Sequence, residues 1–319
     1  MIAFGPVPSR RLGRSLGINN IPPKVCTYAC VYCQVGRTTE MTIDRRPFYD
    51  PGEIAQDVQE KVEKSQEAGE PIDYLTFVPD GEPTLDANLG HEIDLLKPLG
   101  IPIAVITNNS LLSRQDVRED LMAADWVSLK VDSVEERTWR RVNRPYGRLK
   151  LASILEGALA FARSFRGKLV TETMLVAGVN DGEEHLGEVA GFLGRLCPDT
   201  AYLAIPTRPP TEKWVRPPDE GTLNRAYQIL SEKVGRVEYL IGYEGDAFAF
   251  TGDLEQNLLS ITAVHPMRED AVSAFLARAG AEWEAVDRLV AEGQLTQAEY
   301  KGHTFYLRRL RTHAGENAQ

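Results

Sequence analysis

The sequence predicts an α/β protein, a partial (β/α)6 parallel barrel followed by a small C-terminal domain that resembles a winged helix. Short aliphatic runs alternate with amphipathic segments as far as about residue 235, and this strand–helix unit recurs roughly six times. Right-handed crossovers wind such units into a parallel barrel, and a closed barrel needs about eight of them. Because the pattern changes near residues 250–262, we expect a barrel domain at 1–250 and a second domain at 251–319.

Six short runs have the composition of buried parallel strands. Their residues are mostly aliphatic or β-branched, and Gly, Pro, Asn or Asp bounds them. Between the runs, apolar residues recur with helical spacing, as Ile54, Val58 and Val62 do. The predicted strands are 16–18, 74–78, 103–106, 126–131, 170–176 and 202–205, and further predicted helices include 89–96, 151–165 and 181–196.

The last part of the chain predicts two helices followed by a β-hairpin. Residues 268–279 and 283–290 are amphipathic, and residues 295–310 alternate around a Lys301-Gly302-His303 turn. Two helices and a hairpin in so short a segment resemble a winged-helix module. Residues 258–319 carry seven basic and eight acidic side chains, which favours docking to a protein over binding to nucleic acid, despite the basic run that begins at Arg308.

Composition and charge are those of an ordinary globular protein. Of the 319 residues, 43% are hydrophobic and 26% are charged, so a substantial core can form. The formal net charge of −10 argues against non-specific binding to phosphate backbones. No stretch of the length needed to span a bilayer is free of charge, and the N-terminus lacks the pattern of a secretory signal. We therefore expect a soluble cytoplasmic protein without a membrane partner.

Three of the four cysteines lie within eight residues, as Cys26, Cys30 and Cys33 in a C-x3-C-x2-C spacing. Clustered thiolates are soft ligands that select an iron–sulfur cluster, zinc or Cu(I). A structural zinc needs a fourth ligand, and Cys197 is distant and is expected to be a buried apolar thiol. A [4Fe–4S] cluster held by three cysteines leaves one iron open to a substrate or cofactor. Because the loop follows the first predicted strand, it belongs at the carboxyl edge of the barrel.

This cysteine loop, with Tyr32 as the aromatic residue before its last cysteine, resembles that of the radical S-adenosylmethionine (SAM) superfamily. The resemblance covers about residues 10–235 and includes further motifs in the same order. It implies that Cys26, Cys30 and Cys33 bind a [4Fe–4S] cluster whose open iron chelates SAM. The partial barrel predicted from the strand–helix pattern is the fold that the resemblance implies.

Two motifs after the second and third predicted strands extend the resemblance. Asp80-Gly81-Glu82-Pro83-Thr84-Leu85 is similar to the family's Gly-Glu-Pro element, whose backbone receives the amino group of SAM. Within it, Pro83 fixes the turn, Glu82 is a candidate for a structural role, and Asp80 stands where many members have Gly. Thr107-Asn108-Asn109 is similar to the family's Thr-Asn-Gly and places Thr107 and Asn108 as contacts of SAM or of the neighbouring loop.

Three further positions are implied to contact SAM. Ser128 matches the position that contacts the ribose, and Lys130 matches the position that pairs with the methionine carboxylate. Both point to the same side of a strand because they are two residues apart, unless Lys130 already lies past the strand end in water. Ile205 matches positions that line the adenine.

Several charged residues have two interpretations. Glu172 interrupts the fifth predicted strand and either meets SAM or substrate from inside the barrel or pairs with a core arginine. Arg144 in an Asn-Arg-Pro element either binds a carboxylate or orients its loop, and Arg208 is a candidate substrate contact. Arg10, Arg11 and Arg14 precede the first predicted strand and either bind an anionic group or form ordinary ion pairs.

The resemblance implies an enzyme of oxidoreductase or lyase type that reductively cleaves SAM to a 5′-deoxyadenosyl radical, which abstracts hydrogen from a substrate. The substrate is open among a tRNA base, as in wyosine synthesis, a glycyl-radical partner protein and a small molecule. The chain also resembles stand-alone members that open with Gly-Pro-Val-Pro-Ser-Arg-Arg. An electron donor such as flavodoxin or ferredoxin is implied. The alternative is an iron–sulfur redox-sensing regulator that acts through the winged helix, but a sensor needs no SAM motifs.

Overall fold

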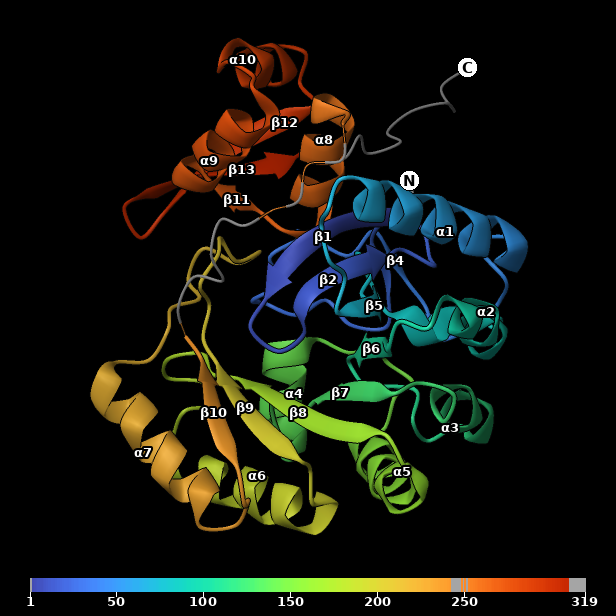
Figure 1. Ribbon diagram of the computed structural model, residues 1–319. Helices are drawn as coiled ribbons and strands as arrows, with labels where there is room; N and C mark the ends of the chain where they lie inside the picture. Colours follow the sequence, from blue (N-terminus) through green and yellow to red (C-terminus); the bar gives the residue numbers. More distant parts are fainter. Residues whose placement is uncertain (1, 242–247, 249, 251, 310–319) are drawn as a thin grey trace, which may run out of the picture.

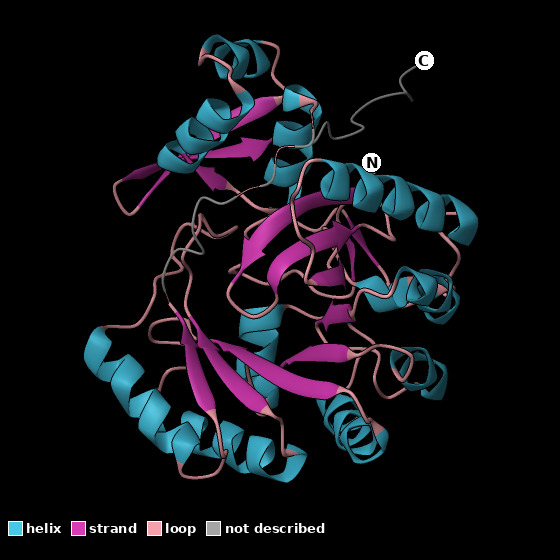
Figure 2. Cartoon of the chain, viewed as in Figure 1, coloured by secondary structure: helices cyan, strands magenta, loops and turns pink. Residues whose placement is uncertain are grey.

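The computed structural model describes residues 2–241, 248, 250 and 252–309. In this part of the chain, eight strands form one sheet in the order β1-β2-β5-β6-β7-β8-β9-β10. The sheet curls, and helices cover its outer face (Figures 1 and 2). The strands are β1 (Ala3–Ser9), β2 (Gly13–Ile18), β5 (Tyr74–Phe77), β6 (Ile103–Thr107), β7 (Trp126–Lys130), β8 (Lys168–Met174), β9 (Thr200–Ala204) and β10 (Val237–Leu240).

The partial parallel barrel predicted from the sequence is confirmed, with two additional strands. From β2 to β10 all neighbouring strands are parallel, whereas β1 pairs with β2 in antiparallel fashion. The six predicted strands correspond to β2 and β5–β9, whereas β1 and β10 were not predicted. β1 contains Pro6 and Pro8, which a strand tolerates at the edge of a sheet. β10 has only four residues and includes the charged Glu238, so its sequence does not form an apolar run.

The presence of β1 also corrects the placement of the N-terminal arginines. Arg10 and Arg11 lie in the turn between β1 and β2, and Arg14 is part of β2. They were predicted to precede the first strand. The β1–β2 hairpin returns the chain toward the carboxyl edge of the sheet, where β2 ends ahead of the cysteine loop.

Helices on the outside of the sheet bury one face each. In α1, Ile54 and Val58 are fully buried at the spacing that the sequence shows, and Asp50 caps the helix by accepting hydrogen bonds from the Gly52 and Glu53 amides. The helices are α1 (Pro51–Glu67), α2 (Leu89–Leu96), α3 (Gln115–Leu121), α4 (Glu136–Asn143), α5 (Leu151–Ser164), α6 (Glu183–Leu196) and α7 (Glu220–Ser231), with 3-10 turns η1 (Pro83–Leu85) and η2 (Lys97–Leu99).

Alternation along β7 decides which side chains reach the inside of the curled sheet. Val127 and Leu129 belong to the large core beneath the helices. Trp126 belongs to a smaller cluster on the inner face with Val170. Since successive side chains of a strand point to opposite faces, Ser128 and Lys130 lie on the inner face above Trp126. The same alternation places Glu172 of β8 inside, two residues beyond Val170.

The C-terminal part has a hydrophobic core of its own, which includes Phe248, Leu258 and Phe275. Its two predicted helices and hairpin correspond to α9, α10 and β12–β13, whereas α8 and β11 were not predicted. The winged-helix interpretation and the boundary at residue 250 remain predictions. Leu310 and Arg311 lie outside the described residues. The elements are α8 (Leu254–Val264), β11 (Met267–Arg268), α9 (Glu269–Ala279), α10 (Glu284–Ala291), β12 (Leu295–Tyr300) and β13 (His303–Arg308).

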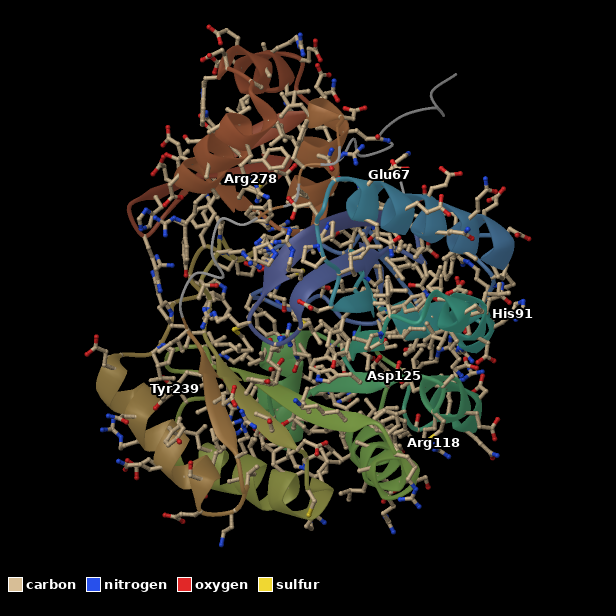
Figure 3. The ribbon with its side chains drawn as sticks, in the orientation of Figure 1. Glu67, His91, Arg118, Asp125, Tyr239 and Arg278 are labelled. Atoms are coloured by element: carbon tan, nitrogen blue, oxygen red, sulfur yellow. The ribbon has the colours of Figure 1, made fainter. Side chains whose placement is uncertain are left out.

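Several described contacts join this part to the barrel. Arg278 of α9, which Figure 3 labels, pairs with Glu70, which follows α1. Lys61 of α1 donates a hydrogen bond to Asn257 of α8. The Tyr300 hydroxyl donates to the Pro206 carbonyl at 3.0 Å, so the hairpin touches the loop after β9. Over the described residues, no helix combines the length and apolar character needed to cross a membrane.

Candidate active site

The cysteine loop lies between the end of β2 and helix α4. Its first cysteine, Cys26, is the last residue of the short strand β3 (Val25–Cys26), which pairs with β4 (Glu40–Met41). The loop backbone is fixed to the end of α4, because the Ala29 amide donates to the Asn143 carbonyl at 3.1 Å and the Val31 amide donates to the Val142 carbonyl at 2.9 Å. Hydrogen bonds to a distant part of the chain therefore set the path of the loop.

The three loop thiols are partly buried and close enough to affect one another. Burial, followed by the charge of Asp132, raises the pKa of Cys30 to about 12, and the charge of Cys33 contributes. Burial and the charge of Cys30 also raise the pKa of Cys26. Thiolates at these positions need a bound cation, which an iron centre supplies. Within the described residues, no three His, Cys, Asp or Glu side chains already meet in a metal-binding group, so the fit rests on the soft donor set.

Two asparagine amides reach the thiols. The Nδ2 atom of Asn108 lies 3.6 Å from Cys26 Sγ, and that of Asn143 lies 3.5 Å from Cys30 Sγ. Asn143 also donates to Asp132 at 2.7 Å, and the Tyr32 hydroxyl donates to the same carboxylate. Neither Asn143 nor Asp132 was predicted to belong to the site, since only the fold brings them to the loop.

The Gly-Glu-Pro element packs directly against the cysteine loop. A Cβ on Gly81 would lie 1.9 Å from the Val25 carbonyl oxygen, so only glycine fits. The Glu82 amide donates to the same oxygen at 3.2 Å. The Glu82 carboxylate then accepts from the Thr107 hydroxyl at 2.5 Å and from the Asn108 amide at 2.7 Å. Glu82 thus ties together the ends of β5 and β6, in agreement with a structural role.

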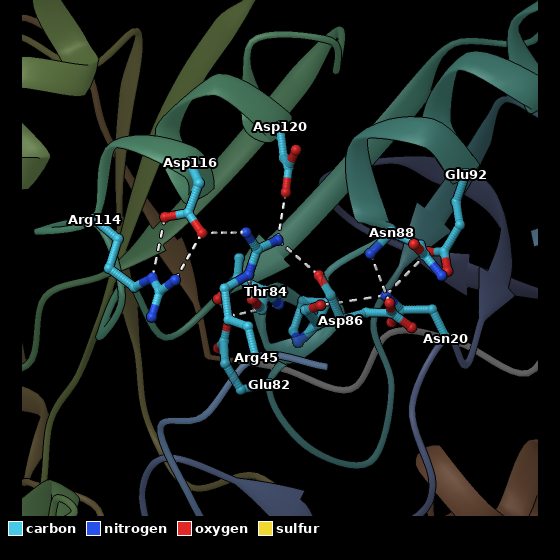
Figure 4. Close-up of polar contacts among 11 residues, drawn as sticks. Asn20, Arg45, Glu82, Thr84, Asp86, Asn88, Glu92, Arg114, Asp116 and Asp120 are labelled. Carbon is cyan, nitrogen blue, oxygen red and sulfur yellow. Dashed lines mark hydrogen bonds and ion pairs between the residues drawn. The ribbon is translucent and has the colours of Figure 1, made fainter. Parts of the chain in front are cut away.

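Behind this element, a buried polar network holds η1 in place (Figure 4). Arg45 donates to the Thr84 carbonyl at 2.8 Å and pairs with Asp116 and Asp120 of α3. The Asn20 amide donates to the Pro83 carbonyl and to Glu92, both at 3.2 Å. Burial and the neighbouring Asp86 raise the pKa of Glu92, which favours the neutral carboxyl at this position. The network fixes the backbone at Pro83 without any contact to the barrel interior.

Charged side chains line the inner face at β7 and β8. Lys130 and Glu172 are register partners and form an ion pair, and Arg11 approaches the other carboxylate oxygen at 2.5 Å. Burial alone would raise the pKa of Glu172, but the charges of Lys130 and Arg11 lower it to about 2. Glu172 therefore does pair with an arginine from the barrel. The alternative that Lys130 lies past its strand is wrong, because Lys130 is the last residue of β7.

A cavity of about 260 Å³ opens between the cysteine loop and these charged residues. Of the predicted cofactor contacts, Tyr32, Lys130 and Ile205 line it, together with Cys33. Six other predicted contacts do not line it, although Gly81 and Thr107 are adjacent in sequence to the lining residues Asp80 and Ile106. Those six are Gly81, Glu82, Pro83, Thr107, Asn108 and Ser128.

Comparison with known proteins identifies the origin of this arrangement. Residues 20–190, more than half of the chain, match the family model described as the radical SAM superfamily. The chain belongs to the radical SAM superfamily. Its cofactors are accordingly a [4Fe–4S] cluster and SAM, and the cysteine motif of the superfamily is present at Cys26, Cys30 and Cys33.

Relatives of this radical SAM protein match along different shares of its length. The UPF0026 protein MJ1312 of Methanocaldococcus jannaschii is 47% identical over 98% of this chain and 97% of its own. A UPF0026 protein of Synechocystis is 36% identical over 65% of this chain and 76% of its own. Among solved structures, a radical SAM methyltransferase from Sphaerobacter thermophilus has a TM-score of 0.54 at 17% identity, covering 70% of this chain and 66% of that one.

The structure of TYW1 with a lysine–pyruvate adduct bound is a further neighbour of this radical SAM protein. It has a TM-score of 0.51 at 16% identity and covers 69% of this chain and 74% of that chain. Both structural matches show the shared fold of the superfamily.

The prediction for Cys197 is wrong. This cysteine is exposed rather than buried. It caps the end of α6 with a positive φ of 51°, and its thiol donates to the Gly194 carbonyl at 3.0 Å. Because α6 ends ahead of β9, Cys197 lies at the amino edge of the sheet, opposite the cysteine loop. It is far from the radical SAM site, as its position in the sequence indicated.

Asp80 is the most unusual residue of the cavity wall. Its side chain is buried, and among the described residues its Oδ1 atom has no hydrogen-bond partner. Burial raises the pKa of Asp80 to about 7, although the charges of Lys24 and Arg308 oppose the rise. A buried carboxylate oxygen that faces a cavity without a partner is suited to accept a hydrogen bond from a bound ligand.

Two other arginines considered in the sequence have partners in the structure. Arg144 pairs with Glu212 at 2.6 Å on the outside of the cysteine loop, so it binds a carboxylate of its own chain. Arg208 lines the cavity, donates to Gln34 at 2.8 Å, and lies 2.9 Å from Nε2 of His265. Through His265 and Tyr300, the C-terminal part contacts the β9 loop of the radical SAM barrel.

Proposed function

We propose that this protein is a radical SAM enzyme in which Cys26, Cys30 and Cys33 bind the cluster and the adjacent cavity binds SAM and substrate. When bound, the cluster supplies the electron that splits SAM into methionine and a 5′-deoxyadenosyl radical, which abstracts hydrogen from the substrate. The observation that carries the proposal is the cavity itself. It joins Cys33 of the motif loop to charged and apolar residues on the inner face of the barrel.

The residues around the cavity have distinct proposed roles in holding SAM. The backbone carbonyl of Gly81 accepts the methionine amino group, and Pro83, whose own carbonyl accepts hydrogen bonds from the Asn20 side chain and the Asp86 amide, fixes the turn beside it. Glu82 holds this backbone against Thr107 and Asn108. An ammonium group needs acceptors of this kind, which the carbonyls of a fixed turn provide.

The other end of SAM meets the inner face of the sheet in this proposal. Lys130 pairs with the methionine carboxylate and retains its ion pair with Glu172. Ser128 contacts the ribose. Ile205 packs on the adenine, and Tyr32 closes the cavity beside the loop. Lys130 is buried and charged, so an anionic ligand beside it is favoured over an apolar one.

The substrate class remains open among a tRNA base, a glycyl-radical partner protein and a small molecule, with an oxidoreductase or lyase type of reaction. We propose that the C-terminal part is a winged-helix-like domain at 251–319 that docks the substrate or a partner protein. Its contacts to the β9 loop, through Tyr300 and Pro206, support this role. A reducing compartment, the cytoplasm, suits three free thiols in one loop, and flavodoxin or ferredoxin suits the need for one electron.

The decisive experiment compares two cysteine variants after anaerobic reconstitution with iron and sulfide. With dithionite and SAM, the wild-type protein should release 5′-deoxyadenosine, measured by liquid chromatography, and show the absorbance of a [4Fe–4S] cluster. Cys30→Ala should lose both signals because one ligand of the cluster is removed. Cys197→Ala is the matched control, since this exposed thiol lies at the opposite edge of the sheet.

Normal SAM cleavage by Cys30→Ala would contradict the proposal. A cluster that loads in the wild-type protein but never yields 5′-deoxyadenosine would instead favour the redox-sensing regulator, especially if the protein were retained on DNA. Profiling of tRNA nucleosides and of small metabolites after deletion of the gene would then separate the substrate classes.

A further inference from the structure

We propose that Asn143 and Asn108 are positioning residues of the cluster, whose side-chain amides donate hydrogen bonds to the thiolates of Cys30 and Cys26 and thereby raise the reduction potential. The inference rests on the proposed function, because only a cluster held by these thiolates has a potential to be set. Neither asparagine lines the cavity proposed for SAM, so this role is separate from the binding of SAM or substrate in that cavity.

The contacts of Asn143 with oxygen atoms fix which end of its amide faces Cys30. Its Nδ2 atom lies 2.7 Å from the Asp132 carboxylate. Because a carboxylate can only accept, the nitrogen rather than the oxygen of the amide must lie on this side. The Tyr32 hydroxyl, 3.4 Å from the same nitrogen, donates its own hydrogen to that carboxylate. One N–H of Asn143 is thus bound to Asp132, and the other is available to Cys30 Sγ, 3.5 Å from the nitrogen.

The orientation of Asn108 is fixed in a similar way. The Ser110 amide donates to Asn108 Oδ1 at 3.0 Å, which places the amide nitrogen on the opposite side. That nitrogen donates to the Thr27 hydroxyl at 2.8 Å and lies 3.6 Å from Cys26 Sγ. The backbone amide of Asn108 donates to Glu82 at 2.7 Å, so the residue is held at its backbone as well. Like Asn143, Asn108 gives one N–H to an oxygen and has a second N–H for a sulfur.

The second N–H of each asparagine suits a sulfur that carries negative charge. A neutral thiol is a weak acceptor, whereas a hydrogen bond to an ionised acceptor is about twice as strong as one between neutral groups. Cysteines that bind a metal centre do so as thiolates. The two amides, whose orientation is set by oxygen contacts alone, are therefore arranged for the thiolate form of the loop.

The direction of the effect follows from the charge that reduction adds. Burial around the three loop cysteines disfavours one more negative charge on the cluster and its thiolates. Asp132 acts in the same direction, because its charge opposes ionisation of Cys30. The amide N–H groups turn the positive ends of their dipoles toward the sulfurs, and such hydrogen bonds help to set the potential of an iron–sulfur cluster. Asn143 thus offsets part of the effect of the carboxylate that orients it.

The test is a redox titration of the reconstituted full-length protein without SAM, followed by electron paramagnetic resonance of the reduced cluster. Asn143→Ala and Asn108→Ala should each lower the equilibrium constant for one-electron reduction by about tenfold, which is about 59 mV. This measurement needs no turnover, so it does not depend on the substrate or on the cleavage of SAM.

Asn180→Ala is the matched control. Asn180 is buried, and its side-chain amide donates to the carbonyls of Asp132 and Met174 at 2.9 Å and 2.8 Å. Its removal therefore disturbs the same region without removing a donor to sulfur. The cluster of Asn180→Ala should keep the wild-type potential.

A second measurement uses the wild-type protein, so the test does not depend on whether an alanine variant loads its cluster. Asparagine labelled with ¹⁵N at the side-chain amide is incorporated, and hyperfine spectroscopy of the reduced cluster should then detect nitrogen coupled through the N–H···S contacts. The oxygen-bound amide of Asn180 is expected to give no such coupling.

Wild-type potentials in both Asn143→Ala and Asn108→Ala would overturn the inference, as would an equal shift in Asn180→Ala. Absence of nitrogen coupling in the labelled wild-type protein would also overturn it. Failure of the proposed function is distinguishable, because the wild-type cluster would then titrate but release no 5′-deoxyadenosine with dithionite and SAM.

Discussion

Glu82 and Glu172 are both buried carboxylates inside the barrel, 1% and 7% exposed, yet their neighbours hold them in opposite ways. Glu82 is surrounded by neutral donors, the hydroxyls of Thr84 and Thr107 and the Asn108 amide. Burial raises the pKa of Glu82 even though these hydrogen bonds oppose the rise. Glu172 lies between the cations Lys130 and Arg11, and its pKa falls to about 2.

The comparison shows that neutral hydrogen-bond donors and cations have different effects on a buried anion. Neutral donors fix the geometry of Glu82 and join two strand ends, but they do not fully compensate the loss of water. At Glu172, two cations more than offset the loss of water. The two cations and the one carboxylate together carry a net positive charge. The first carboxylate is suited to hold a backbone in place, and the second is suited to keep a lysine poised for an anionic ligand.

Removal of the Glu172 charge should have the largest effect. Glu172→Gln leaves Lys130 and Arg11 together without their anion, and we expect a loss of about 3–5 kcal/mol in the free energy of unfolding. Urea titration of the cluster-free protein measures this. Glu136→Gln, which breaks an exposed pair with Arg140, should cost below about 0.5 kcal/mol.

The cause can be isolated by a second substitution. Adding Lys130→Met to Glu172→Gln removes one of the two facing cations and should recover part of the lost stability. If Glu172→Gln and Glu136→Gln lowered the free energy of unfolding equally, the buried ion pairs would contribute no more to stability than an exposed pair.

Glu82→Gln should have a smaller effect. The amide retains one acceptor for Thr84 and Thr107 but turns an N–H toward the Asn108 amide, which loses its acceptor. One unsatisfied buried donor costs about 1–3 kcal/mol, measured by the same titration. If Glu82→Gln proved more costly than Glu172→Gln, the contrast between the two carboxylates would be reversed.

The pH dependence of stability should be the smallest of these effects. As the pH rises, the contributions of the two carboxylates to the free energy of unfolding should change in opposite directions. Because the pKa of Glu172 is lowered from 4.5 to about 2, its contribution to stability is complete above about pH 4.5 and is lost as the pH falls toward 2. Because the pKa of Glu82 is raised, its folded state holds the proton more tightly, and its contribution declines as the pH rises above about 4.5.

Urea titrations at several pH values, with each Gln variant as the reference for its own wild-type residue, measure both curves. The difference between wild type and Glu172→Gln should grow from pH 3 to pH 5 and then level off. The difference in the free energy of unfolding between wild type and Glu82→Gln should shrink as the pH rises above about 4.5. Two curves of the same slope would contradict the assignment of neutral donors to one carboxylate and cations to the other.

The sequence alone was sufficient for the parallel barrel and the motif loop. Buried strands such as β7 and β8 are short aliphatic runs whose period and boundaries are local properties. The spacing of Cys26, Cys30 and Cys33 is equally local, and thiolate softness limits what it can bind. The edge strand β1 escaped prediction because its prolines are acceptable only where a neighbouring strand is missing, which is a property of the sheet.

What only the tertiary structure decided is which polar groups meet across long separations in the chain. Arg11 reaches Glu172 from 161 residues away, and Asn143 reaches Cys30 from 113 residues away. No periodicity records such contacts, because they depend on how β1–β2, α4 and β8 converge at one edge of the sheet. The burial of Lys130 and the exposure of Cys197 were decided in the same way, since desolvation and charge depend on neighbours in space.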